Sequence, residues 1–272
     1  MSARREGDPI AALVGRDRAL VWAGVAGLAL VAWLYLVRLS RGMAIAPEGM
    51  AGMPGMSPVL VPWTLADYGA TVAMWAIMMV AMMLPSAAPL VLLFAAVNRK
   101  RREEGGLAVS TGVFVLGYLG AWGAFSVGAA LAQWGLHTAA LLSPFMATTS
   151  PIVAGALLIA AGVYQLTPLK AACLAKCRSP LGFLLTEWRE GAAGALRMGL
   201  RHGAYCLGCC WLLMGLLFVT GVMNLVWVAV IALFVLLEKV APGGVVVGRA
   251  GSVALILGGI VLLGRAAGMG GM

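Results

Sequence analysis

Charge is scarce in this sequence of 272 residues: only 11% are Asp, Glu, Lys or Arg, whereas an average soluble domain has about 25%. The charges fall into a few short clusters between long neutral segments, so they could not cover the surface of a water-soluble fold. A hydrophobic content of 62% excludes an intrinsically disordered chain, and the scarcity of Glu and Lys excludes a coiled coil. We therefore expect an integral membrane protein whose main partner is the lipid bilayer.

Other absences narrow the function. No glycine-rich phosphate-binding loop with Lys and Ser or Thr is present, which argues against nucleotide-driven chemistry. The only two histidines are His137 and His202, too few and too far apart for paired haem ligation. No charged residue lies well inside a predicted span, because Asp67 and Glu238 sit at span edges, and this disfavours proton-coupled transport. We expect a binding protein more than an enzyme.

The neutral segments predict an all-α, polytopic transmembrane helical bundle with about seven spans, six being the alternative. A span needs about 20 apolar residues. The segment 202–237 is too long for one span, and Gly221 to Asn224 marks the turn of a helical hairpin inside it. The other predicted spans are 19–37, 68–97, 107–133, 148–166 and 245–263.

The distribution of Lys and Arg predicts the orientation. With the N-terminus in the cytoplasm, the inner segments hold 16 of the 19 basic residues. The net charge of +9 is thus a topology signal, and we expect no nucleic-acid partner. The predicted segments are a cytoplasmic N-terminal segment 1–18, a first span 19–37, an outer Met-rich loop 38–66, spans two to four in 67–166, a cytoplasmic Cys-bearing loop with an amphipathic helix in 167–201, and spans five to seven in 202–272.

The cytoplasmic loop 167–201 contains a helix signal. Ser179 can cap a helix, and Pro180 is tolerated in its first turn. Apolar residues then recur every three or four positions up to Leu200, which predicts one interfacial amphipathic helix on the inner leaflet.

All five cysteines fall on the predicted cytoplasmic side, where a reducing environment argues against structural disulfides. The cysteines form two groups along the sequence, and helical spacing places the members of each group on one helix face. His202 lies four residues before Cys206. Thiolates and an imidazole form a soft metal site, and the two groups resemble halves of a four-thiolate site. Thiol redox chemistry and simple helix packing are the alternatives. The groups are Cys173 with Cys177, and Cys206 with Cys209 and Cys210.

Methionine is abundant, with 16 residues. Thioethers bind Cu(I) but are poor ligands for Zn(II), so the Met residues of the outer loop indicate copper capture, or else a linker resting on lipid headgroups. A stripe in the second span is either a path for the metal or packing filler. The loop residues are Met43, Met50, Met53 and Met56, and the stripe is Met74, Met78 and Met82.

Several motifs together resemble a bacterial family of unknown function described as predicted metal-binding integral membrane proteins. They are Trp75-Ala-Ile-Met-Met-Val-Ala-Met-Met-Leu-Pro85, Tyr164-Gln-Leu-Thr-Pro-Leu-Lys170, Arg178-Ser-Pro-Leu181 and Gly203-Ala-Tyr-Cys-Leu-Gly-Cys-Cys-Trp211. The resemblance covers roughly Ala66 to Pro242. It implies a bacterial inner-membrane location and metal binding by the five cysteines, and it implies no reaction.

The leading hypothesis is a membrane protein that handles Cu(I) in copper homeostasis, transfer or cuproenzyme assembly, with a metallochaperone or a larger membrane complex as partner. Cysteines would form the inner site and the loop methionines the outer one. A membrane thiol-disulfide oxidoreductase is an alternative. Another is an accessory subunit with a structural Zn(II) site, since the 37 glycines permit close helix packing.

Overall fold

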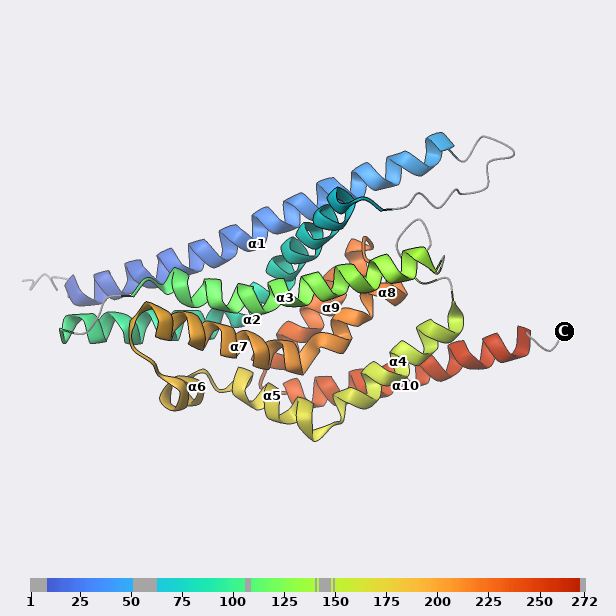
Figure 1. Cartoon of the computed structure of the whole chain (residues 1–272). Coiled ribbons are helices and arrows are strands. Elements are labelled where there is room, and N and C mark those ends of the chain that lie inside the picture. The colour runs from blue at the N-terminus through green and yellow to red at the C-terminus, as the bar shows by residue number, and fades with distance from the viewer. Residues whose placement is uncertain are drawn as a thin grey trace, which may run out of the picture.

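The computed structural model describes residues 9–50, 63–105, 109–139, 141, 148 and 150–269, and these are almost entirely helical. Figure 1 shows long helices lying roughly along one another, with the shorter ones packed between and beside them. The helices are α1 (Pro9–Met50), α2 (Leu65–Glu103), α3 (Thr111–Thr138), α4 (Pro151–Gln165), α5 (Pro168–Arg178), α6 (Pro180–Glu187), α7 (Gly191–Gly215), α8 (Leu217–Thr220), α9 (Leu225–Val240) and α10 (Gly244–Met269). The prediction of an all-α fold is confirmed.

Five of the described helices are long and apolar enough to cross a membrane, or six if the bent pair α4 and α5 forms one span. The axis turns by 64° between these two helices. The predicted count of seven also treated 225–237 as a span. However, α9 has only 16 residues, fewer than the roughly 20 that cross a hydrocarbon core.

Two sequence predictions about the segments between spans are wrong in detail. The amphipathic helix expected from Ser179 to Leu200 is interrupted at 188–190, and its second half is the start of α7. Gly191 has a φ of +74°, a conformation open to glycine, which lets the chain turn between α6 and α7. Within the segment expected as the outer loop, 38–66, α1 continues to Met50 and α2 begins at Leu65.

Glycines bring α3 and α7 into backbone contact along their length (Figure 1). A Cβ added at Gly199 would lie 1.9 Å from the Phe114 carbonyl oxygen, and one at Gly117 would lie 2.1 Å from that of Leu196. Gly199 and Gly203 form a G-x-x-x-G pattern, which allows close approach of two helices. This close pair forms the wall that carries the cysteines of α7.

Gly199→Ala is therefore expected to lower the free energy of unfolding by about 1–3 kcal/mol, because the backbones of α3 and α7 must separate to admit the methyl group. Denaturant titration of the detergent-solubilised protein measures this. Gly123→Ala is the matched control, since a Cβ there would meet nothing within 4 Å. Equal stability of the two variants would contradict the close packing of α3 on α7.

Candidate metal centre

Three of the five cysteines lie on α7 with their side chains buried. Cys206, Cys209 and Cys210 are each 1% exposed, and they lie past the midpoint of the helix. The thiols of Cys209 and Cys210 donate to the Cys206 carbonyl oxygen at 3.0 and 2.9 Å. These contacts hold the three sulfur atoms close to one face of α7.

Helix α5 brings a fourth thiol to this face. It begins with a side-chain cap from Thr167 and with Pro168 in the first turn, and it then packs along α7. The Cys177 thiol interacts with the side chains of Cys206 and Cys209. The structure thus joins the two cysteine groups that are far apart in the sequence.

Cys173 occupies a different position, against the backbone of α7. A Cβ added at Gly208 would lie 2.8 Å from the Cys173 sulfur. The Tyr164 hydroxyl donates to the Gly208 carbonyl oxygen beside it. All five cysteines are free thiols.

The five thiols do not surround one point. Within the part of the chain that the structure describes, no three His, Cys, Asp or Glu side chains are arranged so that they could hold one metal ion. The expected pocket shared by five thiols is therefore not preassembled. The arrangement favours an ion that is satisfied by two thiolates, with thioethers as further ligands.

A buried cation lies directly against the thiols. The Lys239 ammonium group on α9 donates to the Cys206 sulfur at 2.8 Å and to the Ser86 hydroxyl at 3.3 Å, and the residue is 6% exposed. The Tyr118 hydroxyl lies 3.1 Å from the same sulfur and donates to the Met83 carbonyl oxygen at 3.0 Å. From the sequence, Lys239 was only one of the basic residues that indicate the topology. Lys239 comes directly after Glu238, which ends a charge-free segment of 36 residues, and this position is the sequence feature that could have indicated a buried charge.

A buried ion pair fixes α5 to α9 behind this cation. The Lys170 ammonium group binds the Glu238 carboxylate, and both side chains are 2% exposed. Arg178 donates to the carbonyl oxygens of Glu238 and Ala241. Since Lys170 and Cys177 share α5, while Glu238 and Lys239 are neighbours on α9, the ion pair sets the position of Cys177 relative to Lys239.

His202 is 3% exposed and packs among aromatic rings. Its ring stacks on those of Phe114 and Tyr118 and meets Phe183 edge-on. The Nδ1 atom has no hydrogen-bond partner. His202 therefore borders the thiol group through Tyr118 but is not assembled with it as a ligand set.

The methionines of α2 are all buried. Met74, Met78 and Met82 are between 0 and 6% exposed, but the sulfur that contacts a thiol is that of Met83, 3.9 Å from the Cys210 sulfur. Met43 and Met50 belong to the end of α1, where the structure describes the helix but not the side chains. Met53 and Met56 lie outside the described residues. The expected outer methionine site thus lies outside the described structure.

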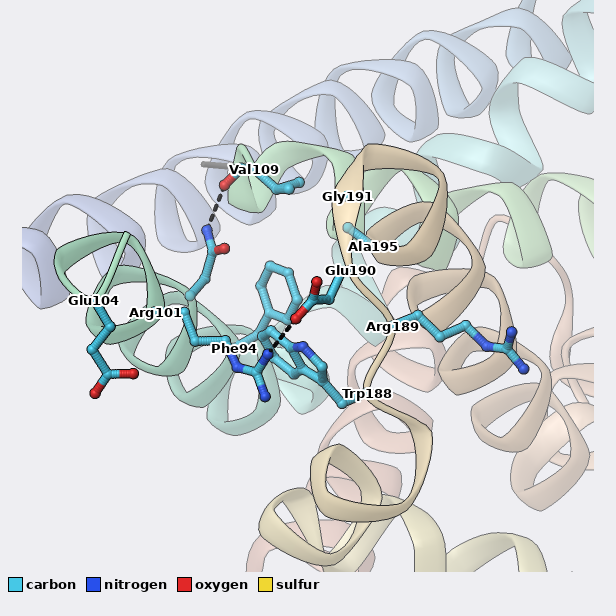
Figure 2. Close-up of a pocket in the computed structure, with 10 residues that line it drawn as sticks. Phe94, Arg101, Glu104, Val109, Trp188, Arg189, Glu190, Gly191 and Ala195 are labelled. Carbon is cyan, nitrogen blue, oxygen red and sulfur yellow. Dashed lines mark hydrogen bonds and ion pairs between the residues drawn. The ribbon is translucent and has the colours of Figure 1, made fainter. Parts of the chain in front are cut away.

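A surface pocket lies elsewhere, where the end of α2 meets the α6–α7 break. Figure 2 shows Arg101 paired with Glu190 at its rim, at 2.8 Å, and the Arg101 guanidinium group lies 4.5 Å from the centre of the Trp188 ring. The pocket has a volume of about 340 Å³, and no cysteine or methionine lines it. It is not the candidate metal centre.

Comparison with known proteins gives one family. A family model described as PpoB2, copper chaperone, matches residues 72–262, which run from α2 into α10 and include every cysteine. No curated protein and no solved structure matches the chain. The match agrees with the metal binding expected from the sequence motifs, and its description says nothing about a membrane.

Proposed function

Because the chain belongs to the PpoB2 copper chaperone family, we propose that it binds Cu(I) as cargo between α5 and α7 and passes it to a partner protein. The thiols of Cys177, Cys206 and Cys209 supply the ligands, two at a time. The observation that carries this proposal is the Lys239 ammonium group at 2.8 Å from the Cys206 sulfur.

The charge of the site favours Cu(I) over Zn(II). Two thiolates with one Cu(I) carry a net charge of minus one, which the Lys239 ammonium group balances. With the same ligands, Zn(II) would leave an excess positive charge in a buried site, and uncompensated buried charge is costly. Zn(II) also favours four ligands, whereas no set of three or more His, Cys, Asp or Glu is assembled in the described residues. Thiolates and thioethers are the soft ligands that select Cu(I).

We further propose that the protein resides in the bacterial inner membrane with its N-terminus in the cytoplasm. The support is the set of long apolar helices together with their exposed apolar faces. On α1, Leu30 and Val31 are 60 and 65% exposed, and on α10, Ile260 and Val261 are 54 and 52% exposed. A lipid environment accounts for such surfaces. The partner is a soluble metallochaperone or a larger membrane complex that accepts or delivers the copper.

The proposal predicts the effect of removing single thiols. In anaerobic Cu(I) titrations against a chromophoric competing chelator, Cys206→Ser is expected to weaken the affinity at least about a hundredfold, about 3 kcal/mol, because it removes the thiolate that the Lys239 ammonium group contacts. Cys209→Ser is expected to act in the same direction. Cys173→Ser is the matched control, since its sulfur packs against Gly208, and its affinity should stay within about threefold of the original.

Two results would contradict the proposal. One is wild-type protein that retains stoichiometric Zn(II) and does not exchange it for Cu(I), which favours a structural zinc site. The other is a disulfide between α5 and α7 that cycles with a thiol reductant while copper affinity is absent, which favours thiol-disulfide exchange.

A further inference from the structure

A further sulfur contact lies next to the thiol centre, which is the group of Cys177, Cys206 and Cys209. It is the contact of 3.9 Å between the sulfur atoms of Met83 on α2 and Cys210 on α7. Both residues are buried, at 0 and 1% exposed. Lys239 does not donate to either sulfur, because its hydrogen bonds go to Cys206 and Ser86.

The register of the two helices adds two more sulfurs. Trp75 of α2 packs on Phe218 of α8, just beyond α7, with ring centres 5.3 Å apart. Met79 lies one turn from Met83 along α2, in the direction of Trp75. Met214 lies one turn from Cys210 along α7, in the direction of Phe218. Both are 0% exposed and belong to the same core cluster. The two observed contacts thus bracket Met79 and Met214, and helical register predicts that these two side chains face each other between the contacts.

We propose that Cys210, Met83, Met79 and Met214 form a second Cu(I) site, which receives copper from the thiol centre. This inference rests on the proposed function. It adds the residues through which copper would move away from the thiols next to α5. One thiolate and neutral thioethers make a Cu(I) complex with no net charge, which suits a site without a cation of its own. The thiol centre, in contrast, holds two thiolates and has Lys239 beside it.

The transfer balances in charge and in protons. As copper leaves the Cys206 and Cys209 thiolates, the Cys210 S–H bond breaks and a Cu–S bond to Cys210 forms. The released proton passes to one of the vacated thiolates, and Lys239 stays paired with the other. The Cys210 thiol donates to the Cys206 carbonyl oxygen at 2.9 Å, so the proton starts next to the residue that loses the copper. Copper moves one way and a proton the other, with no net charge displaced and no change in oxidation state.

The test uses the full chain in detergent with Met→Leu variants, which remove the thioether while nearly conserving volume. In anaerobic Cu(I) titrations, the wild type is expected to take up a second equivalent of Cu(I). The double variant Met79→Leu/Met214→Leu, and separately Met83→Leu, should weaken this second equivalent at least about tenfold and leave the first unchanged. Met82→Leu is the matched control, because Met82 is equally buried on α2 and lies outside the group.

A second measurement is independent of affinity. In selenomethionine-substituted protein loaded with Cu(I), X-ray absorption at the selenium edge should show a Cu–Se pair whose amplitude falls in the double variant and is unchanged in Met82→Leu. Absence of a second equivalent in the wild type, or of any Cu–Se pair, would overturn the second site while the thiol centre still stands. Absence of all Cu(I) binding would overturn the proposed function as well.

Discussion

Lys170→Met is expected to lower the free energy of unfolding by about 3–5 kcal/mol, because it leaves the buried carboxylate of Glu238 without its cation. The second carboxylate oxygen of Glu238 already lacks a hydrogen-bond partner, and the variant would also remove the hydrogen bond that the carboxylate accepts from Lys170. Denaturant titration in detergent micelles measures the loss. This variant should also weaken Cu(I) binding, since α5 carries Cys177.

A double-mutant cycle separates the pair from its parts. Lys170→Met/Glu238→Leu removes both charges and is expected to be less destabilised than Lys170→Met alone, because no unpaired buried charge remains. Lys176→Met on the same helix is the matched control, with a change within about 0.5 kcal/mol. A double variant as unstable as the sum of the two single variants would show that the two charges do not interact.

Lys239→Met is expected to weaken Cu(I) binding by about 10–100-fold, the range found when a partner next to the metal ligands is removed. The physical reason is that the complex of two thiolates with Cu(I) then carries an uncompensated negative charge in a buried site. Competition titration with a Cu(I) chelator gives the affinity. In the same variant, Zn(II) bound by two thiolates has no excess positive charge beside it, so Zn(II) binding should become stronger.

Ser86→Ala provides the control for this prediction. It removes the other hydrogen bond of the Lys239 ammonium group but leaves the charge next to Cys206. Its Cu(I) affinity should change by less than about threefold. If Ser86→Ala and Lys239→Met weaken binding equally, the positioning of the side chain matters and its charge does not.

Hydropathy was enough to predict most of the fold. Long neutral segments predict helices, because a helix satisfies its backbone polar groups without water, and the α2, α3 and α10 segments are helical. The break at 188–190 and the short α9 were missed because both depend on packing partners. The apolar pattern that includes Leu196 and Leu200 fits an interfacial helix and the start of α7 equally well, so the sequence does not distinguish the two.

The candidate site was predictable only in part. Helical spacing identified the three cysteines of α7, but it could not show that Cys177 joins them while Cys173 packs against Gly208. It also chose the Met74, Met78 and Met82 stripe, whereas Met83 contacts the thiol. Adjacent residues on a helix differ by about 100° in direction, so only the position of α7 decides which methionine faces it.

The most direct test of the central claim is X-ray absorption at the copper edge of the purified protein loaded with Cu(I). The account predicts Cu(I) with sulfur-only coordination of low number, lost or replaced by oxygen and nitrogen scatterers in Cys206→Ser and unaltered in Cys173→Ser. Coordination dominated by nitrogen or oxygen in the wild type, or a spectrum that does not change in Cys206→Ser, would contradict a thiol centre between α5 and α7.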